Sequence, residues 1–290
     1  MALPSSGVLK LSDLQAEFGG TNPISLSEYY RNGANVTSNN TSVPISGLIR
    51  VGNFYGTKKQ FAYTISSNQR KANLRTLALA AGWDGTTNLL VTIGTNVIVD
   101  SDTTATPALT ISGSFPQGLI LVNNGYIVGM GGAGGNQDGA GYAGGTALSV
   151  SSTLSITNNN TIAGGGGGGG AGTSWSWNGF PRSSPGSGGA SGLVQAAGGS
   201  GSIINGNPSG GPDANGLYSS GGASANWGTG GRPSSPGGIG GSWGSAGDNG
   251  GTVDGVYNYT GYAGGAGGAA VVGNSYITWT VTGNRYGALT

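Results

Sequence analysis

The chain has 290 residues and a formal net charge of +1, with 64 glycines but no cysteine and no histidine. Lack of cysteine excludes disulfides and thiolate chemistry, and lack of histidine removes the commonest general base and metal ligand, so we expect no cofactor and no metal site. The near-zero charge gives no general attraction to nucleic acid, and no apolar run approaches the roughly 20 residues that span a bilayer, so we expect neither a nucleic-acid partner nor membrane insertion.

Residues 1–60 contain an internal repeat. The segment Pro4–Leu14 recurs as Pro44–Phe54 with the same order of turn and apolar residues. Each copy is typical of a turn, a short strand and the start of a helix. A duplicated module without a catalytic constellation favours a docking platform. An ordinary small domain is the alternative, and the two interpretations are compatible.

Two short helices are predicted in this module. Ser12 is a candidate N-cap for a helix that runs to Phe18 and ends at two glycines. A second helix is predicted over Ser25–Arg31, because Ser25 and Glu28 have the spacing of a capping box. The candidate virion-docking residues of the module are Leu11, Leu14, Phe18, Tyr29, Tyr30, Phe54 and Tyr55.

Residues 61–128 are predicted to form a small mixed domain. Strands are expected at 61–65, 89–99 and 108–111, and one helix at 71–81 with Gly82 as its stop. Residues 118–122 and 126–128 flank Asn123-Asn124-Gly125, which is a signal for a β-hairpin.

Residues 129–273 form a glycine-rich tract with seven consecutive glycines at 164–170. Such a composition often indicates a flexible linker or disorder. This tract, however, has few charges, contains several tryptophans and gathers its glycines in packets. A polyproline-II-like helix has three residues per turn and points its N–H and C=O groups outward. Helices of this kind made of glycine can bond laterally, so we predict a polyglycine-II bundle.

A weaker repeat connects this tract to the preceding strands. Val122–Gly129 returns 35 residues later as Thr157–Gly164, and each copy leads into a glycine packet. This indicates strands that feed the glycine helices, as in the turns of a solenoid. At 274–290 the alternation that begins at Tyr276 predicts a strand that closes the structure against 61–128. The predicted fold is therefore mainly β with little α: a docking module (1–60), a mixed domain (61–128), a polyglycine-II bundle with long loops (129–273) and a closing strand (274–290).

The segments between the glycine packets are rich in aromatic residues and arginine, which dominate binding hot spots. Tyrosine, serine, glycine and asparagine are also the usual paratope mixture. We expect part of these aromatics to bind a receptor and part to cover the bundle. The candidate receptor-binding residues are Trp175, Trp177, Phe180, Arg182, Tyr218, Trp227, Arg232, Trp243, Tyr257, Tyr259 and Tyr262.

Several stretches resemble phage tail proteins. The opening from Leu3, with Leu-Ser-Asp-Leu-Gln-Ala-Glu-Phe-Gly-Gly and the later Gly52-Asn-Phe-Tyr-Gly, is similar to the N-terminal region of many tailed-phage tail and fibre proteins. The segments that begin at Asn73 and Thr278, together with the glycine tract, resemble glycine-rich tail proteins. The tract itself resembles the distal tail-fibre adhesins of T-even-like phages.

The resemblance implies polyglycine helices in a sandwich, with variable loops that recognise a bacterial surface receptor, either an outer-membrane protein or a glycan. Those adhesins cap a separate trimeric fibre, whereas this chain carries a docking module of its own, so a homotrimer is also possible. The implied partners are other virion tail proteins and the receptor. The implied location is the tail of the virion, after synthesis in the host cytoplasm without a signal peptide.

We therefore expect a receptor-binding tail-fibre or tail-tip adhesin. The alternative is a structural virion protein without receptor binding, such as a head decoration or a tail-assembly component. An enzyme that degrades surface polysaccharide needs paired carboxylates. The tract offers only Asp138, Asp213, Asp248 and Asp254, so we predict that the protein is not an enzyme.

Overall fold

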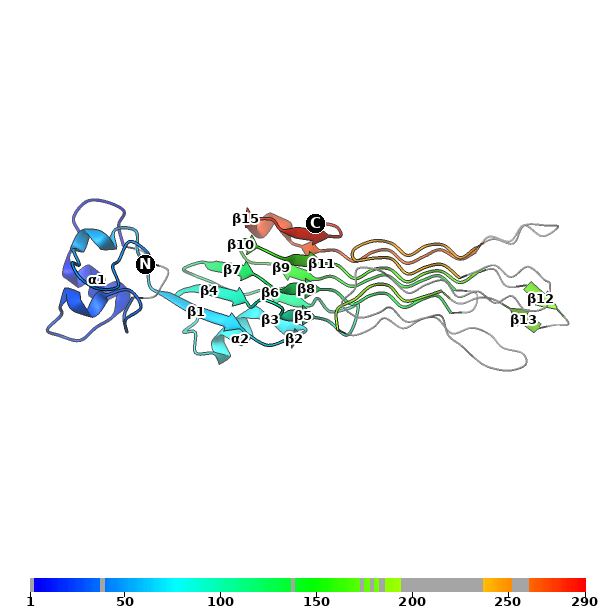
Figure 1. Cartoon of the computed structure of the whole chain (residues 1–290), viewed down its shortest axis with the longest axis horizontal. Helices are drawn as coiled ribbons and strands as arrows, with labels where there is room; N and C mark the ends of the chain where they lie inside the picture. The colour runs from blue at the N-terminus through cyan, green and yellow to red at the C-terminus, as the bar shows by residue number, and fades with distance from the viewer. Residues whose placement is uncertain are drawn as a thin grey trace.

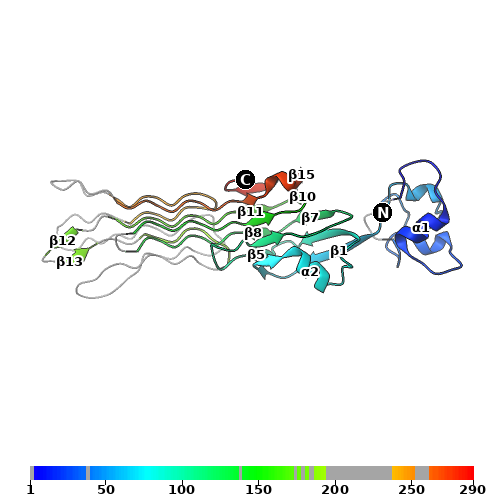
Figure 2. The same cartoon turned by 180° about the vertical axis from the view of Figure 1, so that it is seen from behind.

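The computed structural model describes residues 3–36, 40–136, 139–172, 175–177, 180–182, 186–193, 237–251 and 261–290. The molecule is elongated (Figure 1). A small N-terminal module lies at one end and β-sheets form the middle. Extended glycine-rich segments run from the sheets towards β12 (Trp175–Trp177) and β13 (Phe180–Arg182) at the other end. The view from behind shows the same order along the long axis (Figure 2).

The N-terminal module contains α1 (Leu11–Phe18) and two 3₁₀ turns, η1 (Leu26–Tyr29) and η2 (Val51–Phe54). The predicted end of α1 is confirmed. Its N-cap, however, is Lys10 and not Ser12, because the backbone N–H of Lys10 donates to Asp13 Oδ2 at 2.8 Å and so begins the helix earlier.

The predicted capping box at the second helix is confirmed. The hydroxyl of Ser25 caps η1, and the N–H of Ser25 donates back to Glu28 Oε1 at 3.1 Å. The element is a single 3₁₀ turn that ends at Tyr29 rather than at Arg31, because Tyr30 already has an extended backbone.

The middle of the molecule is a parallel β-solenoid built from three sheets. The first sheet contains β1 (Gln60–Ile65), β4 (Asn88–Ile93), β7 (Leu119–Asn123), β10 (Leu154–Asn158) and β15 (Ile277–Val281). The second contains β2 (Gln69–Arg70), β5 (Ile98–Asp100), β8 (Tyr126–Val128), β11 (Thr161–Ala163) and β16 (Asn284–Tyr286). The third contains β3 (Ala72–Asn73), β6 (Leu109–Ile111), β9 (Leu148–Val150) and β14 (Val271–Val272). Neighbouring strands in these sheets are parallel, and each successive coil stacks on the one before it.

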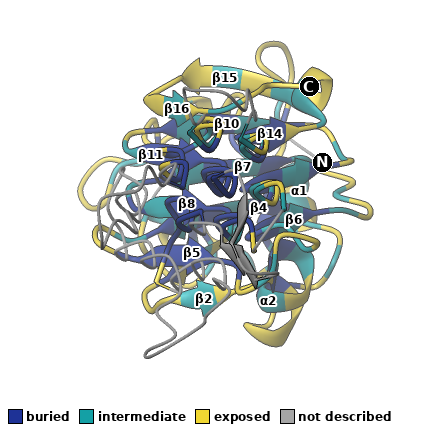
Figure 3. Ribbon diagram, turned by 90° about the vertical axis from the view of Figure 1, so that its right-hand side faces the viewer, coloured by how far each residue is buried: buried dark blue, intermediate teal, exposed yellow. Residues whose placement is uncertain are grey.

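The hydrophobic core lies between the three sheets. Alternate residues point inward, so register partners such as Val91, Leu121 and Ile156 form a buried ladder through successive coils. Seen along the long axis, buried residues occupy the centre and exposed residues the rim (Figure 3). The helix α2 (Leu74–Ala80) packs against β3 and β6 through Leu74 and Ala78, and so covers the start of the solenoid.

Several predicted elements need new boundaries. The strand at 61–65 is confirmed within β1. The helix predicted at 71–81 is present but shorter, because Asn73 belongs to β3 and its side chain then caps α2 by accepting from the N–H of Thr76 at 3.0 Å. The strand predicted at 89–99 is two strands, β4 and β5, since the chain turns between two sheets at Gly94–Val97.

The predicted Asn-Gly hairpin is wrong. Strands β7 and β8 are not partners: β7 pairs with β4 and β10, and β8 pairs with β5 and β11. The asparagines instead stack at a corner of the solenoid, where Asn123 Nδ2 donates to Asn158 Oδ1 at 2.8 Å. The 35-residue repeat places Asn158 of one coil beside Asn123 of the coil before it. Each strand therefore pairs with the equivalent strand of the neighbouring coil and not with the strand that follows it across the Asn-Gly turn.

The solenoid continues past residue 128, where the sequence suggested a domain boundary. Strand β10 pairs with β7, and β15 pairs with β10. The strands between 148 and 163 and the C-terminal strand therefore belong to the same sheets as 61–128. The C-terminal strand does close the sheet, but it does so on β10 and not on a strand of 61–128.

The glycine segments are insertions at one corner of the solenoid. The chain leaves the sheets after β8 and returns at β9, and it leaves again after β11 and returns at β14. Backbone hydrogen bonds between the inserted segments repeat every three residues: Gly129, Gly132 and Gly135 donate to Ala163, Gly166 and Gly169. A helix with three residues per turn requires this period, as the sequence predicted.

The run Gly164–Gly170 is the central segment of the bundle. Its N–H groups donate to the stretches 142–145, 187–190 and 245–248 and, from Gly164, to Tyr286 O. Its C=O groups accept from three other stretches, 132–135, 238–244 and 265–268. A Cβ on any of the seven glycines would lie 1.8–2.0 Å from a backbone oxygen of a neighbour. Segments at the rim instead carry a side chain at every third position, as at Ala263, Ala266 and Ala269. Complete enclosure therefore explains why the central run is glycine throughout.

Candidate recognition and docking surfaces

Four predicted receptor-binding residues lie together on one small ribbon. Strands β12 and β13 are antiparallel, and their register pairs Trp175 with Arg182 and Trp177 with Phe180. The ribbon lies at the end of the molecule farthest from the N-terminal module (Figure 1). The glycine bundle thus places two tryptophans, one phenylalanine and one arginine on adjacent strands at the distal end.

Trp243 does not lie at the distal end, which corrects its assignment to a recognition loop. It is 9 % exposed and packs with Val128, Ala163 and Ala190 where the bundle joins the solenoid. Its indole Nε1 donates to the carbonyl of Ser191 at 3.3 Å. Trp243 is therefore part of the hydrophobic cover of the bundle, the second role that the sequence allowed for these aromatics.

Tyr262 lies on the side of the bundle, where it is exposed. Tyr142, which the sequence reasoning missed, is also exposed there, on a neighbouring helix of the bundle. Tyr142 occupies one of the positions, repeated every third residue, at which the outer segments of the bundle carry a side chain. The three-residue period could therefore have identified it as exposed. The remaining candidates fall outside the described residues: Tyr218, Trp227, Arg232, Tyr257 and Tyr259.

The N-terminal module contains three copies of one capped turn, where the sequence indicated two. In each copy the N–H of the capping residue donates to a side chain three residues on, in the pairs Lys10 and Asp13, Ser25 and Glu28, and Arg50 and Asn53. The residue after each of these pairs is fully buried, and these residues are Leu14, Tyr29 and Phe54. The sequence repeat paired the first and third copies, at Pro4–Leu14 and Pro44–Phe54, and did not connect the middle copy to them.

The three copies are linked in a closed ring. The residue after each buried one reaches the turn of the next copy: Gln15 donates to Gly20 O at 3.3 Å, Tyr30 to Gly47 O, and Tyr55 to Gly7 O at 2.6 Å. At the centre, the rings of Phe18, Tyr29 and Phe54 lie 6.1–6.3 Å apart. Burial, together with Glu28, raises the pKa of Tyr29, whose hydroxyl donates to Gly19 O at 2.7 Å.

This arrangement corrects part of the predicted docking set. Leu14, Phe18, Tyr29 and Phe54 form the core of the module and have no exposed surface to offer a partner, whereas Leu11 and Tyr30 are half-buried and Tyr55 is exposed. The most exposed apolar side chains are Val8 (82 %) and Leu48 (70 %), at equivalent positions two residues before the caps of the first and third copies. Their matching positions in the Pro4 and Pro44 repeats could have revealed them.

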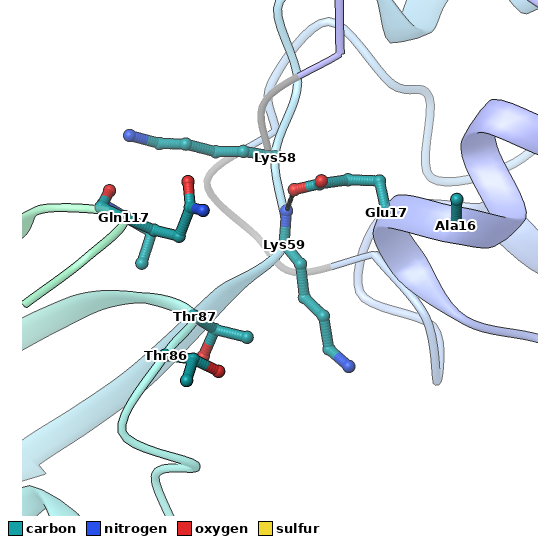
Figure 4. Close-up of a pocket in the computed structure, with 8 residues that line it drawn as sticks. Ala16, Glu17, Lys58, Lys59, Thr86, Thr87 and Gln117 are labelled. Carbon is teal, nitrogen blue, oxygen red and sulfur yellow. Dashed lines mark hydrogen bonds between the residues drawn. The ribbon is translucent and has the colours of Figure 1, made fainter.

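A polar cleft of about 260 Å³ lies between the module and the solenoid (Figure 4). Lys58 and Lys59 of the linker face Glu17 of α1 on one side and Thr87 and Gln117 of the solenoid on the other. The backbone N–H of Lys59 donates to Glu17 Oε1 at 2.7 Å. This bond ties the linker to α1, and we assign the cleft a structural role in joining the two bodies.

The described part of the chain contains no group of three or more His, Cys, Asp or Glu side chains that could hold a metal ion. In that same part, no helix is both long and apolar enough to cross a bilayer. The candidate surfaces for function are the distal ribbon, by its position, and the ring of the N-terminal module, by its exposed apolar side chains.

Comparison with known proteins agrees with this architecture. The family model for the phage tail fibre adhesin Gp38 matches residues 60–290. The crystal structure of the gp37–gp38 adhesin tip complex of the bacteriophage S16 long tail fiber matches with a TM-score of 0.58 and 24 % sequence identity, over 99 % of this chain and 100 % of that chain. No curated protein matches the sequence.

Proposed function

The chain belongs to the Gp38 family of phage tail fibre adhesins, and we propose that it binds a bacterial surface receptor through the distal end of its glycine bundle. It is a component of the virion tail, and its family is one of adhesins and not of enzymes. The observation that carries the proposal is the position of the β12–β13 ribbon, at the end of an elongated molecule opposite the N-terminal module.

The chemistry of the ribbon suits binding without catalysis. The sequence of the ribbon contains three aromatic residues, Trp175, Trp177 and Phe180, and one arginine, Arg182. Aromatic residues and arginine carry most of the energy in protein interfaces, and tryptophan faces also bind cations. The laterally bonded bundle is a rigid support, so little ordering free energy is lost on binding. The receptor is an outer-membrane protein or a surface glycan.

The N-terminal module docks the chain on another tail protein. The structural match is to a gp37–gp38 adhesin tip complex, and the resemblance of the glycine tract to T-even-like adhesins implies a trimeric fibre as the partner. A closed ring of three similar turns gives one chain three similar faces, which suits a partner with threefold symmetry. Val8 and Leu48 are the exposed apolar side chains best placed to contact it. One adhesin chain on a trimeric partner then replaces the homotrimer as the preferred assembly.

Adsorption competition tests receptor binding. The purified chain is incubated with host cells before the phage is added, next to a Trp175→Ala/Trp177→Ala variant and a Tyr276→Ala control that removes an exposed aromatic from the solenoid. We expect wild type and control to block adsorption and the double variant to lose at least about tenfold in potency. A folded wild-type protein that neither binds cells nor blocks adsorption would favour the structural-protein alternative.

Incorporation into virions tests docking. Phages that encode Val8→Asp/Leu48→Asp are compared with phages that encode Tyr276→Asp, which places a single carboxylate at an exposed position of the solenoid. Because an interface that buries two unpaired carboxylates is strongly disfavoured, the double variant should be absent from purified particles although it is expressed and folded. Normal incorporation of the double variant would refute docking through this ring.

A further inference from the structure

Two surface loops of the N-terminal module have the same construction. The loop Pro4–Gly7 leads to Val8, and the loop Pro44–Gly47 leads to Leu48. Both apolar side chains are largely exposed, whereas the residue after each of them packs against the core of the module. The chain therefore holds the far side of each exposed residue through the core, and the loop controls the near side.

The loop Pro4–Gly7 is held at both ends by the copy of the capped turn that follows it around the ring. The N–H of Gly56 donates to Pro4 O at 3.0 Å, and the hydroxyl of Tyr55 donates to Gly7 O at 2.6 Å. The Gly7 carbonyl belongs to the planar peptide group that joins Gly7 to Val8. The Tyr55 hydroxyl thus fixes the peptide group from which the exposed side chain departs.

The loop Pro44–Gly47 has the same two bonds. The N–H of Arg31 donates to Pro44 O at 3.0 Å, and the hydroxyl of Tyr30 donates to Gly47 O. Gly47 has a φ of +81°, a left-handed conformation that favours glycine. Both loops therefore use a tyrosine hydroxyl on the peptide group directly before the exposed apolar residue.

The middle copy carries a third exposed apolar side chain, Pro23, at the equivalent position. No tyrosine reaches this loop from the preceding copy. Gln15 takes its place, and its Nε2 donates to Asn22 Oδ1 at 3.2 Å and to Gly20 O at 3.3 Å. The ring of a proline restricts its own φ. Pro23 therefore depends less on an external hydroxyl than the other two positions do.

We propose that Tyr30 and Tyr55 are positioning residues for docking: they fix the peptide groups that carry Leu48 and Val8 and so present these two side chains to the partner in a defined direction. This inference rests on the proposed docking function. A loop that is ordered before binding loses less free energy when the interface forms. The order of the loops can be measured without a partner.

The test uses the full chain with Tyr55→Phe or Tyr30→Phe, each of which removes only a hydroxyl. Gly7→Ala perturbs the first loop with Tyr55 intact, because its φ of +94° disfavours alanine while an added Cβ meets nothing within 4 Å. Thr57→Val is the matched control, since Thr57 Oγ1 donates to Phe54 O at 2.7 Å in the same module but in neither loop. Backbone order parameters from NMR and the apparent Kd for virions assembled without this chain are measured for each form.

In Tyr55→Phe and Gly7→Ala, the order parameters at 7–9 should fall from about 0.85 towards about 0.6. In Tyr30→Phe the fall should occur at 47–49 instead. The apparent Kd should rise about threefold to tenfold in each of these variants, as the loss of one hydrogen bond implies, and should not change in Thr57→Val. The effect is local, so Tyr55→Phe should weaken association less when Val8 is already alanine than when Leu48 is.

Unchanged order parameters in all three loop variants would overturn the anchoring of the loops. Lower order with unchanged association, or an equal loss of association in Thr57→Val, would overturn the positioning role. Failure of the folded wild-type chain to associate with these virions would contradict docking, and with it the positioning role, while the order parameters would still decide whether the hydroxyls anchor the loops.

Discussion

Replacing Gly168 by alanine should disrupt the glycine bundle. A Cβ there would lie 1.8 Å from Ala133 O and 2.4 Å from Ala133 C, whereas ordinary contacts begin near 3.4 Å. To relieve this overlap, the two backbones would have to separate by more than about 1 Å. A gap of that size removes a large part of the dispersion attraction between them. The same two stretches are joined by the bonds from Gly132 N to Gly166 O and from Gly135 N to Gly169 O, both 2.8 Å long, and both bond to the stretch of Tyr142.

The magnitude follows from these contacts. Overpacking costs about 1–3 kcal/mol, and two or three weakened hydrogen bonds add about 1 kcal/mol each. Alanine also restricts the unfolded chain, which offsets only about 0.4–1 kcal/mol. A net loss of roughly 3–5 kcal/mol is large beside the total stability of about 5–15 kcal/mol of ordinary proteins.

Calorimetry and hydrogen exchange over 164–172 measure this loss. At about 2–4 °C per kcal/mol, the melting temperature of the bundle should fall by roughly 6–20 °C. The matched control is Ala266→Ser, which enlarges a side chain at an exposed rim position and should change stability by less than about 0.5 kcal/mol. If Gly168→Ala melts within a few degrees of wild type with unchanged exchange, the claim that the central run must be glycine is refuted.

Three further predictions concern the solenoid and its junction with the bundle. Asn158→Ala should cost about 2–4 kcal/mol in denaturant unfolding, because it removes a buried acceptor of the Asn123 amide and the bonds that Asn158 donates to Thr282 O and Asn284 O; a loss below about 1 kcal/mol would argue against the asparagine ladder. Trp243→Ala should lower the melting temperature and speed exchange around Ser191, and an effect on cell binding alone would contradict its buried position. For Asp84, burial raises the pKa, but N–H donors of Thr87 and Thr86 outweigh it and lower the pKa overall. The contribution of ionised Asp84 to folding stability is therefore present at a pH above the unfolded-state pKa of about 3.9. It is lost as the pH falls through the lower pKa of the folded state. Wild type and Asp84→Asn should therefore differ in stability at pH 6 and converge in strong acid, and a constant difference would refute this origin.

Local signals in the sequence predicted individual elements well. The capping box at Ser25 and the strand at 61–65 depend on residues near in sequence, and both are present. The three-residue period of the bundle was also predictable, since it follows from the geometry of glycine chains. The hairpin at Asn123 failed because parallel coil stacking is a long-range interaction, which a two-residue turn signal does not report.

The neighbours within the bundle could not be predicted in the same way. Most glycine packets have nearly identical sequences, so no residue pattern indicates which packets lie side by side and share hydrogen bonds. Two signals do carry information. An uninterrupted run such as 164–170 indicates a helix enclosed on all sides, and a side chain at every third position, as at Met130 and Ala133, indicates the rim. Trp243 was misplaced because an aromatic among glycines has the same local context at a junction and at a tip.

The bundle grows from one corner of an otherwise regular solenoid. The link between the second and third strands of successive coils is Lys71 alone, then 101–108, then 129–147 and finally 164–270. After the longest insertion the chain still returns to register, because β14 pairs with β9. Closing a longer loop adds only about 0.6 kcal/mol per doubling, and the described parts of the inserted segments bond to one another laterally. The sheets and the inserted segments therefore depend on different residues. Changes in the inserted segments outside the glycine positions should leave the solenoid that supports them unaltered.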